Sequence, residues 1–182
     1  MLSKKDVMIT IETFRYGLNV PLFPADEDVD EVDEIDEIDE EMLAASESAA
    51  TELDEDDEDA PQNAQMMMEG RLVVTSRRAE LVYHESELTG MEGSVTKIGF
   101  DLDCPELVSM LRGGAVNTAL IFEEGRRHIC VYNTPFSSFE VCIHTLKVEN
   151  NILTSGKLYL DYLIEIHGAR TERCKMTLTF RE

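Results

Sequence analysis

The chain has 182 residues, of which 43 % are hydrophobic and 30 % are charged, a length and composition that suit one ordinary domain with a buried core. Its formal net charge of -22 argues against nucleic-acid binding, because an acidic chain repels phosphate backbones. No apolar run is long enough for a signal peptide or a membrane span. The four cysteines form no C-x-x-C pair, so we expect a cytoplasmic protein with reduced thiols and no membrane contact.

The acidity belongs to one segment near the start of the chain. Asp26 to Asp59 contain 20 Asp and Glu and no basic residue, which leaves 18 acidic against 16 basic residues elsewhere, a balance near -2. Like-charge repulsion and few apolar residues predict a disordered insertion over residues 20–64. A transient amphipathic helix over residues 35–53 is an alternative, because apolar side chains recur every three residues from Val29 to Ile38. The charge suggests a basic protein partner and only weak, non-specific cation binding.

The remaining sequence predicts strands in close succession. Val7, Ile9 and Ile11 share one face and alternate with polar residues, which indicates a half-buried strand over residues 5–14. After the insertion, the same alternation and regularly spaced turn signals predict strands from residue 67 to residue 181. They are expected at 68–75, 79–85, 94–102, 106–112, 115–122, 127–133, 138–148, 157–166 and 171–180.

Strands of this spacing, without a helical pattern between them, are typical of a sandwich or an up-and-down barrel. The one-sided alternation favours a meander that closes on itself, since closure removes exposed edges. We therefore predict an all-β, closed antiparallel barrel of about eight to ten strands. It forms a single domain over residues 1–182, interrupted by the insertion.

Several strings outside the insertion resemble one family. Their order and spacing are similar to the YwiB-like family of small bacterial domains of unknown function. The resemblance implies a calycin-type (lipocalin-like) β-barrel and a cytoplasmic location, and it transfers no catalytic or binding residue. The long insertion departs from the family pattern, as does the Phe136-Ser137-Ser138 turn. The strings are KDVMITI at 5–11, ESELTGMEG at 85–93, RGGAVN at 112–117, FEEGRRH at 122–128, YNTP at 132–135 and YLIEI at 162–166.

The corner from Glu85 to Gly93 is a candidate ligand site. Its carboxylates and hydroxyl could line a barrel mouth and, with nearby basic side chains, hold a polar ligand. The alternative is a structural turn in which the glycines supply positive φ and the hydroxyls bond to local backbone. The candidate ligand-binding residues are Glu85, Glu87, Thr89, Arg112, Asn117, His128 and Tyr132.

Two histidines and two cysteines suggest a metal site in the following hairpin. If the strands pair symmetrically about Phe136, His128 lies opposite His144 and Cys130 lies opposite Cys142. Two thiolates and two imidazoles on one face could bind zinc. Against this, H-x-C is not the usual zinc spacing, and a slip of one residue destroys the arrangement. Half-buried cysteines beside surface histidines are the alternative.

A binding module is the leading functional interpretation, with a small ligand at the barrel interior or mouth. The alternative is an interaction scaffold whose acidic segment contacts a basic protein. Catalysis has little support, because the chain lacks a G-x-S-x-G elbow, a P-loop and a dinucleotide fingerprint. We therefore assign no catalytic residue and no cofactor. The basic pair Arg77-Arg78 is either a solvated strand end or an anion contact.

Overall fold

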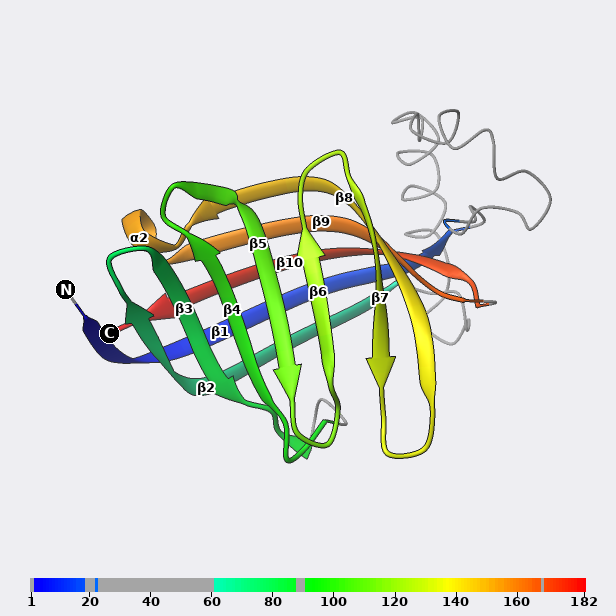
Figure 1. Cartoon of the computed structure of the whole chain (residues 1–182), viewed down its shortest axis with the longest axis horizontal. Helices are drawn as coiled ribbons and strands as arrows, with labels where there is room; N and C mark the ends of the chain where they lie inside the picture. The colour runs from blue at the N-terminus through cyan, green and yellow to red at the C-terminus, as the bar shows by residue number, and fades with distance from the viewer. Residues whose placement is uncertain (1, 19–21, 23–60, 88–90, 168) are drawn as a thin grey trace.

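The computed structural model describes residues 2–18, 22, 61–87, 91–167 and 169–182. Within these ranges the chain forms one ten-stranded sheet that curls into a barrel, with a one-turn helix at one end (Figure 1). The elements are β1 (Ser3–Leu18), β2 (Gln62–Val74), β3 (Arg78–His84), β4 (Val95–Asp101), β5 (Cys104–Gly113), β6 (Thr118–Phe122), β7 (Arg127–Asn133), β8 (Ser138–Asn151), α2 (Ile152–Ser155), β9 (Lys157–Ile166) and β10 (Thr171–Arg181).

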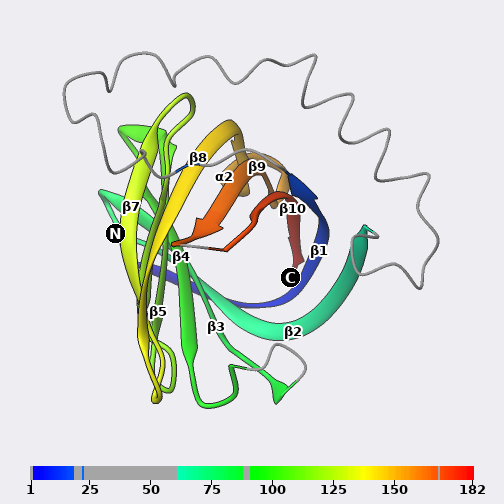
Figure 2. The same cartoon turned by 90° about the vertical axis from the view of Figure 1, so that its right-hand side faces the viewer.

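The sheet is an antiparallel meander whose two chain ends meet in its middle. Its strand order is β6-β5-β4-β3-β2-β1-β10-β9-β8-β7, so β10 pairs with β1 and every other ladder joins strands that are consecutive along the chain. Viewed from the end, the strands curve around a common interior (Figure 2). The predicted all-β up-and-down barrel is therefore confirmed.

The barrel closes between β6 and β7 through a single backbone bridge, and we call this junction the seam. Asn117 and Asn133 exchange two N–H···O bonds of 2.9 Å, but within the described residues the two strands form no ladder beyond them. Backbone groups of antiparallel strands point alternately to either side. Those of Ala119 on β6 and of Ile129 and Val131 on β7 therefore point into the seam.

The alternation seen in the sequence places one face of each strand in the lumen. Val7, Ile9 and Ile11 of β1 are buried there, and inward residues of the other strands complete one continuous core. Large side chains fill this space, so the lumen is a packed core. Fully buried examples are Ile9, Leu81, Ile98, Phe122, Leu158, Leu160 and Leu178.

The strands extend beyond the predicted bounds at the start of the chain. β1 spans Ser3–Leu18 instead of residues 5–14, and β2 begins at Gln62. Residues 62–64 therefore belong to the barrel, and the predicted insertion limit at residue 64 is corrected. The rest of the insertion, apart from Leu22 and residue 61, lies outside the described residues, so its predicted disorder or partial helix stays a prediction.

A second, smaller apolar cluster lies on the outer face of the sheet. Tyr16 and Leu18 of β1 pack there with Leu163 of β9 and Cys142 of β8. Leu22 joins this cluster and is itself 1 % exposed, and its backbone N–H donates to the buried Glu165 carboxylate. Where the structure is described, no helix has the length and apolar character needed to cross a bilayer.

Candidate functional site

The barrel has two mouths that differ in their polar groups. The loop mouth is formed by the β3–β4 loop, the β5–β6 turn and the β7–β8 turn. The terminal mouth lies at the other end, where both chain ends and α2 are found (Figure 1). The residues predicted to bind a ligand are expected near one of these mouths.

A buried ion pair lies just inside the loop mouth. Glu85 follows β3 and its side chain is 2 % exposed, while the side chain of Arg112, on the inward face of β5, is 10 % exposed. Arg112 Nε and Nη2 each lie 3.2 Å from Glu85 Oε1. Thr96 of β4 donates its hydroxyl to the same oxygen at 2.5 Å and accepts from Arg112 Nε at 3.0 Å. Three strands thus place one polar cluster in the lumen.

Tyr83, the second-last residue of β3, completes this cluster. Its ring is buried, and this burial raises the pKa of its hydroxyl, with a further increase from the Glu85 carboxylate. The cluster therefore has one guanidinium that neutralises one carboxylate, flanked by neutral hydroxyls. Because buried charges need such partners, both charged groups are already occupied.

The β5–β6 turn is hydrogen-bonded to the β3–β4 loop and also within itself. Val116 donates its N–H to Ser94 Oγ at 2.9 Å, and Asn117 Nδ2 donates to the Gly114 carbonyl at 3.0 Å. Gly114 has φ +132°, and a Cβ there would lie 2.3 Å from the Gly93 carbonyl oxygen. Asn117 therefore holds the β5–β6 turn together.

The other predicted ligand residues do not gather around the pair. Glu87 is exposed, and Thr89 lies outside the described residues. Tyr132 donates its hydroxyl to Met91 Sδ at 3.3 Å at the loop mouth. His128 is near the opposite end of its strand, where its Nε2 lies 3.2 Å from Glu123 Oε2. The structure therefore brings together Glu85 and Arg112, with Asn117 and Tyr132 at the same mouth.

The hairpin register proposed for a zinc site is wrong. His128 was expected opposite His144 and Cys130 opposite Cys142, but the ladder pairs Ile129 with Cys142 and is displaced by one residue. Because neighbouring side chains alternate between faces, this shift puts His128 and Cys130 on one face of the sheet and Cys142 and His144 on the other. Among the described residues, no three His, Cys, Asp or Glu side chains are grouped to hold a metal ion.

The two thiols of that hairpin are also poor metal ligands where they lie. Cys130 faces the lumen and burial raises its pKa, an effect that the Thr118 hydroxyl partly offsets. Cys142 faces the outer cluster, where burial raises its pKa to about 11. Metal binding requires thiolates, so both environments oppose it.

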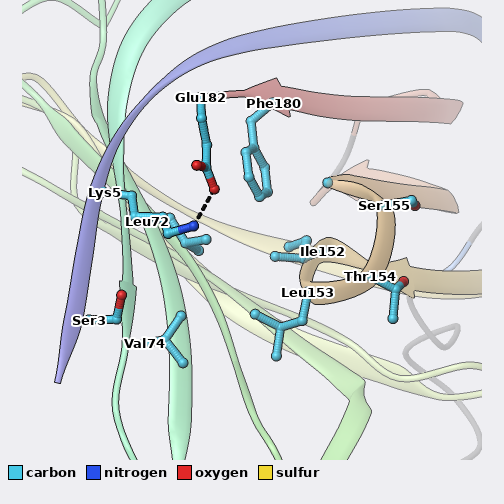
Figure 3. A pocket seen from close by; sticks show the side chains of 11 residues that line it. Ser3, Lys5, Leu72, Val74, Ile152, Leu153, Thr154, Ser155, Phe180 and Glu182 are labelled. Atoms are coloured by element: carbon cyan, nitrogen blue, oxygen red, sulfur yellow. Dashed lines mark hydrogen bonds and ion pairs between the residues drawn. The ribbon is translucent and has the colours of Figure 1, made fainter. Parts of the chain in front are cut away.

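The terminal mouth contains a true pocket of about 350 Å³ (Figure 3). Leu72 and Val74 of β2, Ile152 of α2 and Phe180 of β10 provide apolar walls. Lys5 of β1 lies at the rim and forms an ion pair with Glu182. Of the described residues that line this pocket, Lys5 is the single cation and Glu182 the single anion.

Comparison with known families identifies the chain. A family model for a domain of unknown function, DUF1934, matches residues 48–178. The chain belongs to this DUF1934 family. The fold is similar to the crystal structure of the ywiB protein from Bacillus subtilis, with a TM-score of 0.61 and 13 % identity over 98 % of this chain and 94 % of that chain. A comparison with curated proteins finds no match.

These findings confirm the resemblance to the YwiB-like domains and their barrel. At 13 % identity the likeness to the ywiB protein shows the fold alone. The narrower calycin-type assignment of this DUF1934 domain stays a prediction, as does its cytoplasmic location.

Sequence reasoning missed the terminal pocket of the DUF1934 domain. Lys5 and Glu182 are 177 positions apart, and each looks like an ordinary charged residue at the end of a strand. The available signal was the predicted closure itself, because a meander barrel must bring its first and last strands together. Applied to β1 and β10, that rule would have placed Lys5 near Phe180 and Glu182.

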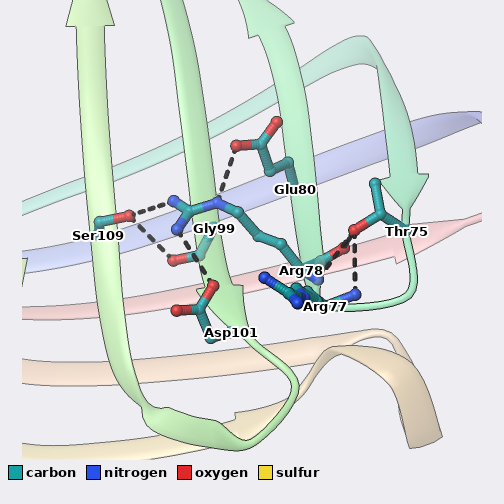
Figure 4. Close-up of polar contacts among 7 residues, drawn as sticks. All are labelled: Thr75, Arg77, Arg78, Glu80, Gly99, Asp101 and Ser109. Atoms are coloured by element: carbon teal, nitrogen blue, oxygen red, sulfur yellow. Dashed lines mark hydrogen bonds and ion pairs between the residues drawn. The ribbon is translucent and has the colours of Figure 1, made fainter.

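The basic pair at the β2–β3 turn has structural partners (Figure 4). Arg78 Nε donates to Glu80 Oε1 and Arg78 Nη2 donates to Ser109 Oγ, both at 2.9 Å. Its Nη1 lies 3.5 Å from Asp101 Oδ1. Arg78 therefore links the outer faces of β3, β4 and β5, and its guanidinium is already neutralised.

Proposed function

We propose that this barrel binds a small amphipathic molecule with an anionic group at the terminal mouth. The observation that carries this proposal is the position of the Lys5 ammonium at the rim of a pocket with apolar walls. The volume of about 350 Å³ lies at the lower end of the range for small-molecule sites. The filled lumen favours the mouth over the interior as the place for a ligand.

The ion pair at the rim is easy to exchange for a ligand. The side chains of Lys5 and Glu182 are 49 % and 64 % exposed, and such pairs contribute about 0–1 kcal/mol. A ligand carboxylate can therefore replace that of Glu182 beside Lys5 at little cost. Its apolar chain would then cover Leu72 and Phe180, and this burial supplies the favourable free energy.

The loop mouth fits a ligand less well, although it holds more of the residues predicted from the sequence. Arg112 and Glu85 already neutralise each other, and both are buried. An anion there would have to displace a buried carboxylate and leave it unpaired, which costs several kcal/mol. The proposed function therefore rests on the terminal mouth.

The test is titration calorimetry with three molecules of equal chain length. Octanoate should bind more tightly than octanol and octylamine, because only the carboxylate can form an ion pair with the Lys5 ammonium. Lys5→Met should weaken octanoate binding about tenfold or more and leave octanol binding unchanged. Lys4→Met is the matched control, since Lys4 does not line the pocket.

Leu153→Asp gives an independent test from another element. Leu153 lines the pocket and is 49 % exposed, so the substitution adds a negative charge without disturbing the core. It should weaken octanoate binding, because like charges then face each other across the rim. Equal binding of octanoate and octanol, or an unchanged affinity in Lys5→Met, would contradict the proposal.

A further inference from the structure

Exposed apolar side chains gather on the outer face of three consecutive strands. We call them the β5–β7 patch, which consists of Leu111, Ala119, Ile121, Ile129 and Val131. Ile129 is 60 % exposed, Val131 is 49 % exposed and Leu111 is 38 % exposed. Ala119 is also exposed, and Ile121 is half-buried.

The patch is continuous across the strands. The β5–β6 ladder sets Leu111 beside Ala119. Continuing the register of the Asn117–Asn133 bridge sets Ala119 beside Val131 and, by the same count, Ile121 beside Ile129. Grouped apolar side chains on a surface mark an interaction site more often than single ones do.

The outer faces of β1 and β10 are more polar. On β10, the outward positions are occupied by Arg173, Lys175 and Thr177, and on β1 Asp6 and Glu12 point outward. These strands also contain single exposed apolar residues, which are ordinary on a protein surface. The β5–β7 patch differs because five apolar side chains adjoin.

A cation and an anion flank the patch in the same cross-strand row. Lys97 of β4 pairs with Leu111, and Glu140 of β8 pairs with Val131. Both charged residues are exposed. The row therefore consists of a positive charge, three apolar side chains with Ala119 in the centre, and a negative charge, in that order.

This row is complementary to itself. A two-fold axis that lies in the interface above Ala119 and runs parallel to the strands brings a second copy face to face with the first, with its row reversed. Lys97 of one copy then faces Glu140 of the second copy, and Leu111 faces Val131. We propose that the β5–β7 patch is the interface of a symmetric homodimer, because isologous contact needs this kind of self-complementary surface.

The charge of the chain outside residues 26–59 is compatible with such a contact. Outside residues 26–59 the net charge is near -2, so two barrels do not strongly repel each other. The order of charges in the row also sets the orientation of the two copies. Like charges stay apart only when the two facing rows run in opposite directions. A second copy therefore matches both the apolar centre and the charged ends.

Sedimentation analysis of the full chain at rising concentration tests the proposal. The expected particle has twice the 20.6 kDa mass of the chain. Val131→Glu should weaken dimerisation at least about tenfold, because it places two carboxylates in the apolar centre. Met67→Glu is the matched control, since Met67 is 69 % exposed on β2, outside the patch, and this variant should dimerise like the parent.

A charge exchange identifies the partner surface. Lys97→Glu and Glu140→Lys should each weaken the dimer, because each creates two like-charge contacts, and the double variant should restore it. Circular dichroism should show an unchanged fold, as both residues are exposed. A monomer at all concentrations would overturn the proposal. So would a dimer that persists in Val131→Glu, or a double variant weaker than both single ones.

Discussion

Replacing Arg112 by methionine should destabilise the barrel far more than the loss of an ordinary surface ion pair. The side chains of Arg112 and Glu85 are 10 % and 2 % exposed, so Arg112→Met leaves a carboxylate in the lumen without its counter-charge. Breaking a buried pair in this way costs about 3–5 kcal/mol. With a urea m-value of about 2 kcal/mol/M, the unfolding midpoint should fall by about 2 M.

The control for this prediction is an exposed pair of the same type. Arg71 and Asp6 lie 2.9 Å apart with side chains that are 57 % and 82 % exposed, so Asp6→Asn should change stability by no more than about 1 kcal/mol. The double variant Glu85→Gln/Arg112→Met should recover part of the loss, because it removes the stranded charge. If Arg112→Met unfolds at the same urea concentration as Asp6→Asn, the buried pair is not an important stabilising contact.

Three further measurements test other features. Gly114→Ala should lower thermal stability by about 1–3 kcal/mol, and by more than Gly125→Ala, because both have positive φ but only Gly114 meets backbone at 2.3 Å. The free energy of unfolding should fall as pH rises from about 9 to 11, since the raised pKa of Cys142 favours the protonated thiol in the folded state, and Cys142→Ala should reduce this slope. A slope that is the same in both proteins would refute that cause. Amide exchange at Ile129 and Val131 should be faster than at Cys130 between them, whose backbone groups point toward β8.

The strands were predictable because their signal is local. Val7, Ile9 and Ile11 alternate with polar residues, and burial of one face of a strand requires this two-residue period. The same reasoning placed β7 and β9 at their observed bounds. It underestimated β1 and β2, because their pairing with each other, and that of β1 with β10, extends both strands past the point where their sequence pattern ends.

The contacts between strands were less predictable, because register depends on turns and bulges. An assumed symmetric turn put His128 opposite His144, and one residue of displacement removed the proposed metal site. Arg112 was named beside Glu85 as a candidate ligand group, yet nothing local shows that the two neutralise each other. The terminal pocket needs the two chain ends together, which only the closed sheet provides.

The seam has a consequence for how this chain can be rewired. Because β1 and β10 are hydrogen-bonded in the middle of the sheet, the two ends of this sequence are interior to the topology, while β6 and β7 from the middle of the chain are its borders. The ion pair between Lys5 and Glu182 shows that the ends lie close enough for a short linker. A circular permutant that joins them and opens the chain between Phe122 and Arg127 would keep every ladder intact, and its new ends would lie where the ring is already weakest.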